Sequence, residues 1–144
     1  MLFKQSMSRF DVTFIDGLHE EHQADRDIVN SLKHLNPRGI IVLLDCLPPD
    51  EWHQRPPAAF LSGENWNGTV WKSALKAMVA SEWRCYVVDC DWGCGVIDTA
   101  QHKISDNIQL QAELRYGRDF RLIYKYVISE HEFLLQLGTE PSRP

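Results

Sequence analysis

The stretch FDVTFIDGLHEEHQADRDIVNSLKHLNPRGIIVLLDC, residues 10–46, decides the fold of this chain. It opens with the alternating run 10–15, which is typical of a β-strand. Residues 20–35 then have the spacing of a helix, with the apolar stripe Ala24, Ile28, Leu32 and Leu35. Pro37 and Gly39 predict the end of this helix. The run 40–44 is apolar without alternation, which indicates a strand covered on both faces. This order predicts two parallel strands joined by a right-handed helical crossover.

A long irregular connection follows at 46–68 and carries four of the seven prolines. Loops of this length inside a domain are commonly lids or binding loops, and the tryptophans argue against plain disorder. We therefore expect Trp52, His53 and Trp66 to line a substrate pocket. The alternative is that these aromatic side chains only anchor the loop to the core.

Residues 69–81 have the spacing of a helix, and its expected buried stripe is Trp71, Ala74, Leu75 and Met78. Two strands, 85–88 and 94–97, flank a tight turn built on Asp91, Trp92 and Gly93, so they are predicted to pair antiparallel. After a polar loop at 101–107, helices are predicted at 108–116 and 133–137, and a mobile tail at 138–144. Residues 121–128 fit either a helix or a strand, and the helix is favoured.

The composition narrows the class of protein. A length of 144 residues suits one domain, 1–144, with a core at about 10–98 and a C-terminal helical extension at about 105–137. A net charge of −5 without a basic cluster argues against nucleic acid. No apolar run reaches membrane-spanning length, and the first ten residues lack the apolar core of a signal peptide. The four cysteines, Cys46, Cys85, Cys90 and Cys94, do not have the spacing of a zinc site. We therefore expect them to be reduced thiols and the protein to be cytoplasmic.

Residues 10–46 follow the pattern D-x-x-F-I-D-G-x-H … D-I … L-x-P-G-G-x-I-x-x-H-D, and the segments 68–77 (GTVWKSALKA) and 91–98 (DWGCGVID) also fit. On these motifs, residues 10–98 resemble the class I S-adenosylmethionine-dependent methyltransferases. The resemblance implies an α/β fold: a partial Rossmann-like sheet of two parallel strands and an antiparallel hairpin, flanked by helices. Two positions depart from the pattern, because Arg38 stands at a glycine and Leu44 at a histidine.

In such a fold the cofactor is held mainly by a glycine-rich turn in the first half of the domain. This sequence has no G-x-G-x-x-G, and its one G-x-G, residues 93–95, lies in the predicted hairpin. We therefore expect the chain to be the C-terminal half of a methyltransferase domain, which binds S-adenosylmethionine weakly or not at all. The resemblance still assigns Asp16 and Gly17 to the cofactor.

The predicted strand at 10–15 would pair in a complete fold with a strand that this sequence lacks. An unpaired strand edge and uncovered apolar faces favour association with other chains. We therefore expect a homo-oligomer that forms through this edge. The alternative is that the first nine residues cover it.

Two carboxylates, Asp16 and Asp45, follow neighbouring predicted strands, where open α/β sheets bind their ligands. Together they could hold a hard cation such as Mg²⁺, and metal-dependent O-methyltransferases have acidic ligands at the matching positions. The neighbours Leu44 and Cys46 are poor third ligands. Asp45 and His19 are the candidate catalytic residues, with His19 as a general base. The alternative is that these polar side chains only cap helices or satisfy loop amides.

The predicted function is therefore O-methyl transfer from S-adenosylmethionine to a small molecule, with the complete fold required for the cofactor. One alternative is a non-catalytic, oligomeric half-domain that does not bind the cofactor. Another is a metal-dependent hydrolase or epimerase that uses Asp16, His19 and Asp45.

Overall fold

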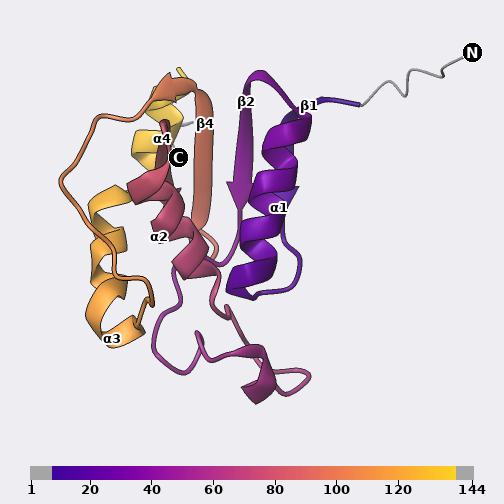
Figure 1. Ribbon diagram of the computed structural model, residues 1–144, viewed down its shortest axis with the longest axis vertical. Coiled ribbons are helices and arrows are strands. Elements are labelled where there is room, and N and C mark those ends of the chain that lie inside the picture. Colours follow the sequence, from indigo (N-terminus) through magenta and orange to yellow (C-terminus); the bar gives the residue numbers. More distant parts are fainter. Residues whose placement is uncertain (1–7, 139–144) are drawn as a thin grey trace, which may run out of the picture.

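The computed structural model describes residues 8–138, in which five strands form one sheet in the order β1-β2-β4-β3-β5 (Figure 1). The strands are β1 (Phe10–Ile15), β2 (Leu35–Leu43), β3 (Trp83–Val88), β4 (Cys94–His102) and β5 (Val127–Ile128). β1 and β2 are parallel, and β4 is antiparallel to both of its neighbours, β2 and β3. The sheet thus confirms the predicted α/β fold with its parallel pair and antiparallel hairpin.

Helices cover the two faces of the sheet unequally. Helices α1 (Glu21–His34) and α2 (Val70–Ala80) lie on one face, together with α3 (Tyr116–Asp119) and the 3₁₀ helix η2 (Phe120–Tyr126). This side holds the main core, in which Ile41, Trp71, Leu75 and Ile123 are fully buried. On the other face, α4 (Glu130–Gln136) covers only part of β3 and β4, where Phe133 packs against Tyr86, Val88 and Val96.

Helix α1 forms as its spacing predicts, within one residue of the expected bounds. Its N-cap is Glu20, whose carboxylate accepts a hydrogen bond from the Gln23 backbone N–H, and Ala24 and Ile28 are buried. The prediction for Leu32 is wrong, because this side chain is 37 % exposed and Ser31 is buried instead. Leu32 lies at the rim of the contact with α2, where it is only partly covered.

Helix α2 and the hairpin are confirmed. All four predicted stripe residues of α2 are buried: Trp71, Ala74, Leu75 and Met78. The turn between β3 and β4 places Asp91, Trp92 and Gly93 at positive φ, which allows the tight reversal. β4 is longer than predicted and runs into the segment expected to be a polar loop.

β2 is also longer than predicted and begins at Leu35 rather than at residue 40. The pairing with β1 shifts between Phe10↔Leu35 and Val12↔Ile40. Residues 36–39, which the sequence predicts to end the helix, therefore form an irregularity within β2. Within it Arg38 has φ +68°, a conformation that glycine adopts more easily.

The C-terminal prediction is only partly right. No helix forms at 108–115, because Leu110 and Leu114 reach the core from an irregular segment. The segment 121–128, where a helix is favoured over a strand, contains both, since η2 is followed by β5, which pairs with β3. The predicted helix 133–137 is confirmed as α4, which starts earlier at a capping box formed by Ser129 and Glu132. Residues 139–144 of the predicted mobile tail lie outside the described residues.

β1 lies at one end of the sheet, and nothing pairs with its outer edge among residues 8–138. On the face away from α1, Phe10, Val12 and Phe14 are 52 %, 56 % and 60 % exposed. None of the helices in the described part of the chain has the length and apolar character needed to cross a lipid bilayer.

Candidate functional site

Three donor side chains meet where β1 and β2 end: Asp16, His19 and Asp45, called here the Asp–His–Asp cluster. Their donor atoms all lie within 4.8 Å of one another. His19 Nε2 is 3.2 Å from Asp45 Oδ2 and 3.5 Å from Asp16 Oδ1. The carboxyl ends of neighbouring parallel strands open at the same edge of a sheet, which explains why residues 29 positions apart become neighbours.

The His19 ring is fixed from the side opposite the carboxylates. Its Nδ1 lies 2.8 Å from the Trp66 carbonyl oxygen, and a carbonyl can only accept, so Nδ1 carries the proton. The ring also stacks on the Trp66 indole, with centroids 5.3 Å apart. His19 therefore directs Nε2 at the two carboxylates, an arrangement that becomes favourable when a proton on Nε2 or a bound cation lies between them.

Asp45 is the most constrained member of the cluster. Its backbone has φ +62°, and its Oδ1 accepts a 3.0 Å hydrogen bond from the side-chain amide of the buried Asn67. Burial raises the pKa of the Asp45 carboxyl, and the charges of Asp16 and Asp91 raise it further, while His19 and the Asn67 bond oppose the shift. A cation next to Asp45 would relieve this unfavourable concentration of negative charge.

The loop that carries His19 is bound directly to the start of α2. The Thr69 N–H donates to the His19 carbonyl (3.0 Å), and the Glu21 N–H donates to Thr69 Oγ1 (2.8 Å). Gly68 makes this approach possible, since a Cβ at this position would lie 1.8 Å from the His19 carbonyl oxygen. The two loops at the carboxyl edge of the sheet therefore hold each other in place.

The three predicted loop aromatics have different surroundings. Trp66 contacts His19, also stacks on Phe60, and donates from its indole N–H to the Arg55 carbonyl. His53 Nδ1 lies 2.7 Å from Asp50 Oδ1, and the His53 carbonyl accepts from the N–H groups of Asn67 and Gly68.

Trp52 is exposed and lies against the Arg55 guanidinium. The guanidinium of the buried Arg55 forms a 2.5 Å ion pair with Glu64. The structure thus brings Trp66 to the Asp–His–Asp cluster, whereas Trp52 and His53 contribute to the order of the loop.

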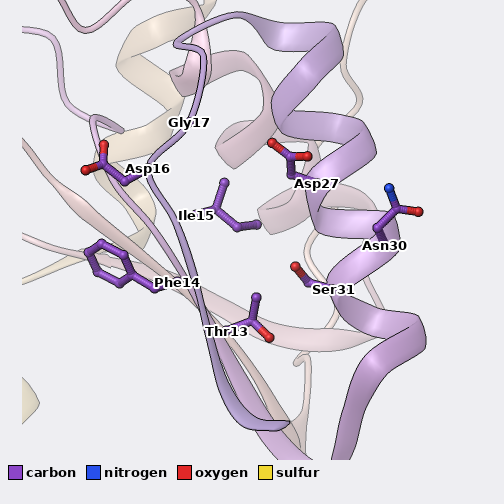
Figure 2. Close-up of a pocket in the computed structure, with 8 residues that line it drawn as sticks. All are labelled: Thr13, Phe14, Ile15, Asp16, Gly17, Asp27, Asn30 and Ser31. Atoms are coloured by element: carbon purple, nitrogen blue, oxygen red, sulfur yellow. The ribbon is translucent and has the colours of Figure 1, made fainter. Parts of the chain in front are cut away.

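Asp16 and Gly17, the residues expected to face the cofactor, line a pocket of about 410 Å³ between β1 and α1 (Figure 2). Figure 2 shows Thr13 and Ile15 directed toward α1, and Phe14 and Asp16 on the other side of β1. Among residues 8–138, the buried Thr13 hydroxyl has no hydrogen-bond partner. The pocket offers carboxylates to a ligand, but Gly17 is the single glycine in its lining, so it lacks a glycine-rich turn for a whole nucleoside cofactor.

Sequence reasoning missed Asn67 and the contact made by the Trp66 backbone. Neither belongs to a motif, and both lie more than 20 residues from their partners in the cluster. The one local signal was the dipeptide Asn67-Gly68, which indicates a turn and hence a fixed point in the long loop.

The donor set fits a divalent cation. Two carboxylates and one imidazole form a mixed oxygen and nitrogen site, and metal-binding histidines commonly donate their second N–H to a backbone carbonyl, as His19 does. The neighbour of Asp45 is not a ligand, because the buried Cys46 thiol donates to the Leu43 carbonyl and burial raises its pKa. The third donor at this edge is therefore His19.

One comparison with known proteins found a match. The family model described as a methyltransferase domain matches residues 2–46, a segment that includes the whole Asp–His–Asp cluster. No curated protein and no solved structure matches the sequence. Domains of this kind use S-adenosylmethionine in general as their methyl donor. The matched segment and the mixed order of the sheet together support a class I S-adenosylmethionine-dependent methyltransferase-like domain.

Proposed function

We propose that this chain serves in methyl transfer from S-adenosylmethionine to an oxygen of a small molecule, and that it provides the site for the acceptor oxygen. The observation that carries the proposal is the Asp–His–Asp cluster at the carboxyl ends of β1 and β2. Ligands of open α/β sheets bind at this edge. Methyl transfer to oxygen needs an acceptor hydroxyl that is oriented and made more acidic.

Asp16, His19 and Asp45 would together hold a divalent cation. A cation there would polarise the acceptor hydroxyl and lower its pKa. The imidazole in the donor set favours Mn²⁺ or Zn²⁺ over the Mg²⁺ expected from two carboxylates alone. Asn67 and the Trp66 carbonyl would act as positioning groups, since each fixes one donor side chain of the cluster.

The other residues at this edge would shape the acceptor site. The stacked rings of Phe60, Trp66 and His19 form an apolar wall beside the donor atoms. Such a wall would exclude water and favour a flat acceptor. On the β1 side, the Asp16–Gly17 turn would face the cofactor. This turn would then lie between the methyl donor and the acceptor hydroxyl.

Calorimetric titration with Mn²⁺ tests the cluster. We expect the wild-type chain to bind Mn²⁺, and Asp45→Asn or His19→Gln to weaken binding by at least about tenfold, because each removes one donor. Asp11→Asn is the matched control, since Asp11 is an exposed carboxylate on β1 outside the cluster. Equal Mn²⁺ binding by wild type and Asp45→Asn would contradict the proposed cation site.

A second experiment tests the acceptor role, with catechol as the acceptor and methyl-labelled S-adenosylmethionine in large excess. We expect catechol to bind the Mn²⁺-loaded chain and to receive label, and Asp45→Asn to abolish both. Bound catechol without labelled product, at a concentration of S-adenosylmethionine that calorimetry shows to be bound by the chain, would contradict methyl transfer and would favour the non-catalytic alternative. No catechol binding would contradict the acceptor site itself.

A further inference from the structure

A cavity of about 640 Å³ lies at the end of the sheet where β2 begins, away from the Asp–His–Asp cluster where β2 ends. Its lining includes Arg9, Arg38, Glu82, Trp83 and His102. Pockets for small ligands commonly have this volume and combine apolar walls with a few charged groups. Nothing in the proposed methyl transfer uses these residues.

Arg38 supplies a positive charge, unpaired among the described residues, to the lining of this cavity. Its φ of +68° is a left-handed conformation that disfavours side chains with a Cβ and that glycine adopts freely. Its guanidinium makes no hydrogen bond or ion pair with residues 8–138, although an arginine offers five N–H donors. The guanidinium of Arg38 is therefore held at the cavity by a residue whose backbone conformation is strained.

Arg9 adds a second and better anchored guanidinium. Its Nη1 donates to the Leu35 carbonyl at 2.9 Å, and its other N–H groups are left for a ligand. Glu82 is the acidic residue in the same lining, so two arginines and one glutamate leave one surplus positive charge. This balance fits a ligand with a single negative charge better than a polyanion.

The remaining wall of the cavity is flat and largely apolar. Trp83 and His102 stack with ring centroids 5.1 Å apart and an interplanar angle of 29°. The partly exposed Leu32 lies in the same lining. A planar ring in the ligand could stack or pack against such a wall while its anionic group meets the arginines.

We propose that this cavity binds a small planar molecule that carries one carboxylate or sulfonate, with Arg38 and Arg9 on the anion and Trp83 with His102 along the ring. Arginine suits this role because its fork pairs with two oxygens of one anionic group. The proposal does not depend on the Asp–His–Asp cluster.

Titration with naphthoate tests the site, and neutral naphthamide, which has the same ring, is the matched ligand control. Binding is followed by nuclear magnetic resonance through the indole N–H signal of Trp83, assigned with Trp83→Phe. We expect naphthoate to shift this signal at lower concentration than naphthamide. Arg38→Gly should weaken naphthoate binding by about tenfold or more, while Arg38→Lys, which keeps the charge but not the two-pronged fork, should lose less affinity than Arg38→Gly.

Thermal unfolding separates lost binding from lost structure. The unfolding midpoint of Arg38→Gly should be at or above that of the wild type, because glycine relieves the strained φ. The proposal is overturned if Arg38→Gly binds naphthoate as tightly as the wild type, or if naphthamide binds equally well. Equal losses in Arg38→Gly and Arg38→Lys would also overturn it, because the charge would then be irrelevant.

Discussion

Asp119 is a buried carboxylate that neighbouring groups hold in its ionised form. It is 5 % exposed, and it accepts hydrogen bonds from Arg118 Nη2 (2.7 Å) and from the Arg115 backbone N–H (2.8 Å). The hydrogen bond from Arg118 lowers its pKa below the ordinary value of 3.8. A depressed carboxyl pKa stabilises the folded state above the unfolded pKa, and this contribution is lost as the pH falls through the folded pKa.

Asp119→Asn should therefore lower the free energy of unfolding by about 1–2 kcal/mol near neutral pH. The difference from wild type should shrink as the pH falls below about 3.8, because the wild-type Asp119 carboxylate then becomes protonated and loses its charge-assisted hydrogen bonds. Urea unfolding of both proteins across a pH series measures this difference in the free energy of unfolding. Glu113→Gln is the control, because the Glu113–Arg115 pair is exposed and should contribute almost nothing. A difference that is independent of pH would contradict this account of Asp119.

At the scale of elements, the loop between β2 and α2 is ordered by contacts with the β1–α1 loop. Gly68 occupies positive φ (+62°) directly against the His19 carbonyl, whereas Gly63 has φ +88° and open space around it. Both glycines relieve backbone strain, but only Gly68 also permits close packing between the two loops. The geometry of the Asp–His–Asp cluster therefore depends on a residue that contributes no donor atom.

Gly63→Ala should cost about 1 kcal/mol of stability, which is the strain of a left-handed alanine. Gly68→Ala should cost about 3 kcal/mol, because a clash with backbone adds to the same strain. Chemical denaturation measures both variants. We further expect Gly68→Ala to lose Mn²⁺ binding and Gly63→Ala to keep it. Unchanged Mn²⁺ affinity in a folded Gly68→Ala protein would show that the contact between the loops does not position His19.

At the scale of the whole molecule, the two ends of the sheet differ. β5 closes one end with a two-residue strand, which offers little backbone to another chain. β1 closes the other end with six residues, and three apolar side chains project from it with more than half of their surface exposed. The edge of β1 is therefore the surface through which we expect two copies of the chain to pair.

Val12→Lys should reduce this association, since a lysine in the middle of an edge strand opposes pairing with a second strand. Sedimentation velocity over a range of concentrations measures the oligomeric state. Leu61→Lys provides the control, because Leu61 is 67 % exposed but lies in the long loop away from β1. A wild-type chain that stays monomeric at every concentration would contradict the prediction.

Much of the fold was predictable because its signals are local. The buried stripe of α2 and the alternation of β1 are periodic within a few residues, and the turn at 91–93 needs residues that tolerate positive φ. The errors fall where a distant partner decides the structure. Residues 108–115 form no helix because Leu110 and Leu114 pack into the core. β5 forms because it can pair with the free edge of β3.

The sequence by itself determined the strand–helix–strand unit and placed Asp16, His19 and Asp45 after the strands. Local periodicity and breakers are sufficient for this, since they act over one turn of helix or one pair of residues. Only the tertiary structure decided that the His19 ring faces both carboxylates, because the Trp66 carbonyl and Asn67 reach the cluster from the end of the long loop. It also decided that Arg38 opens onto a cavity with Arg9 and Trp83. Contacts across such separations leave no periodic trace in the sequence.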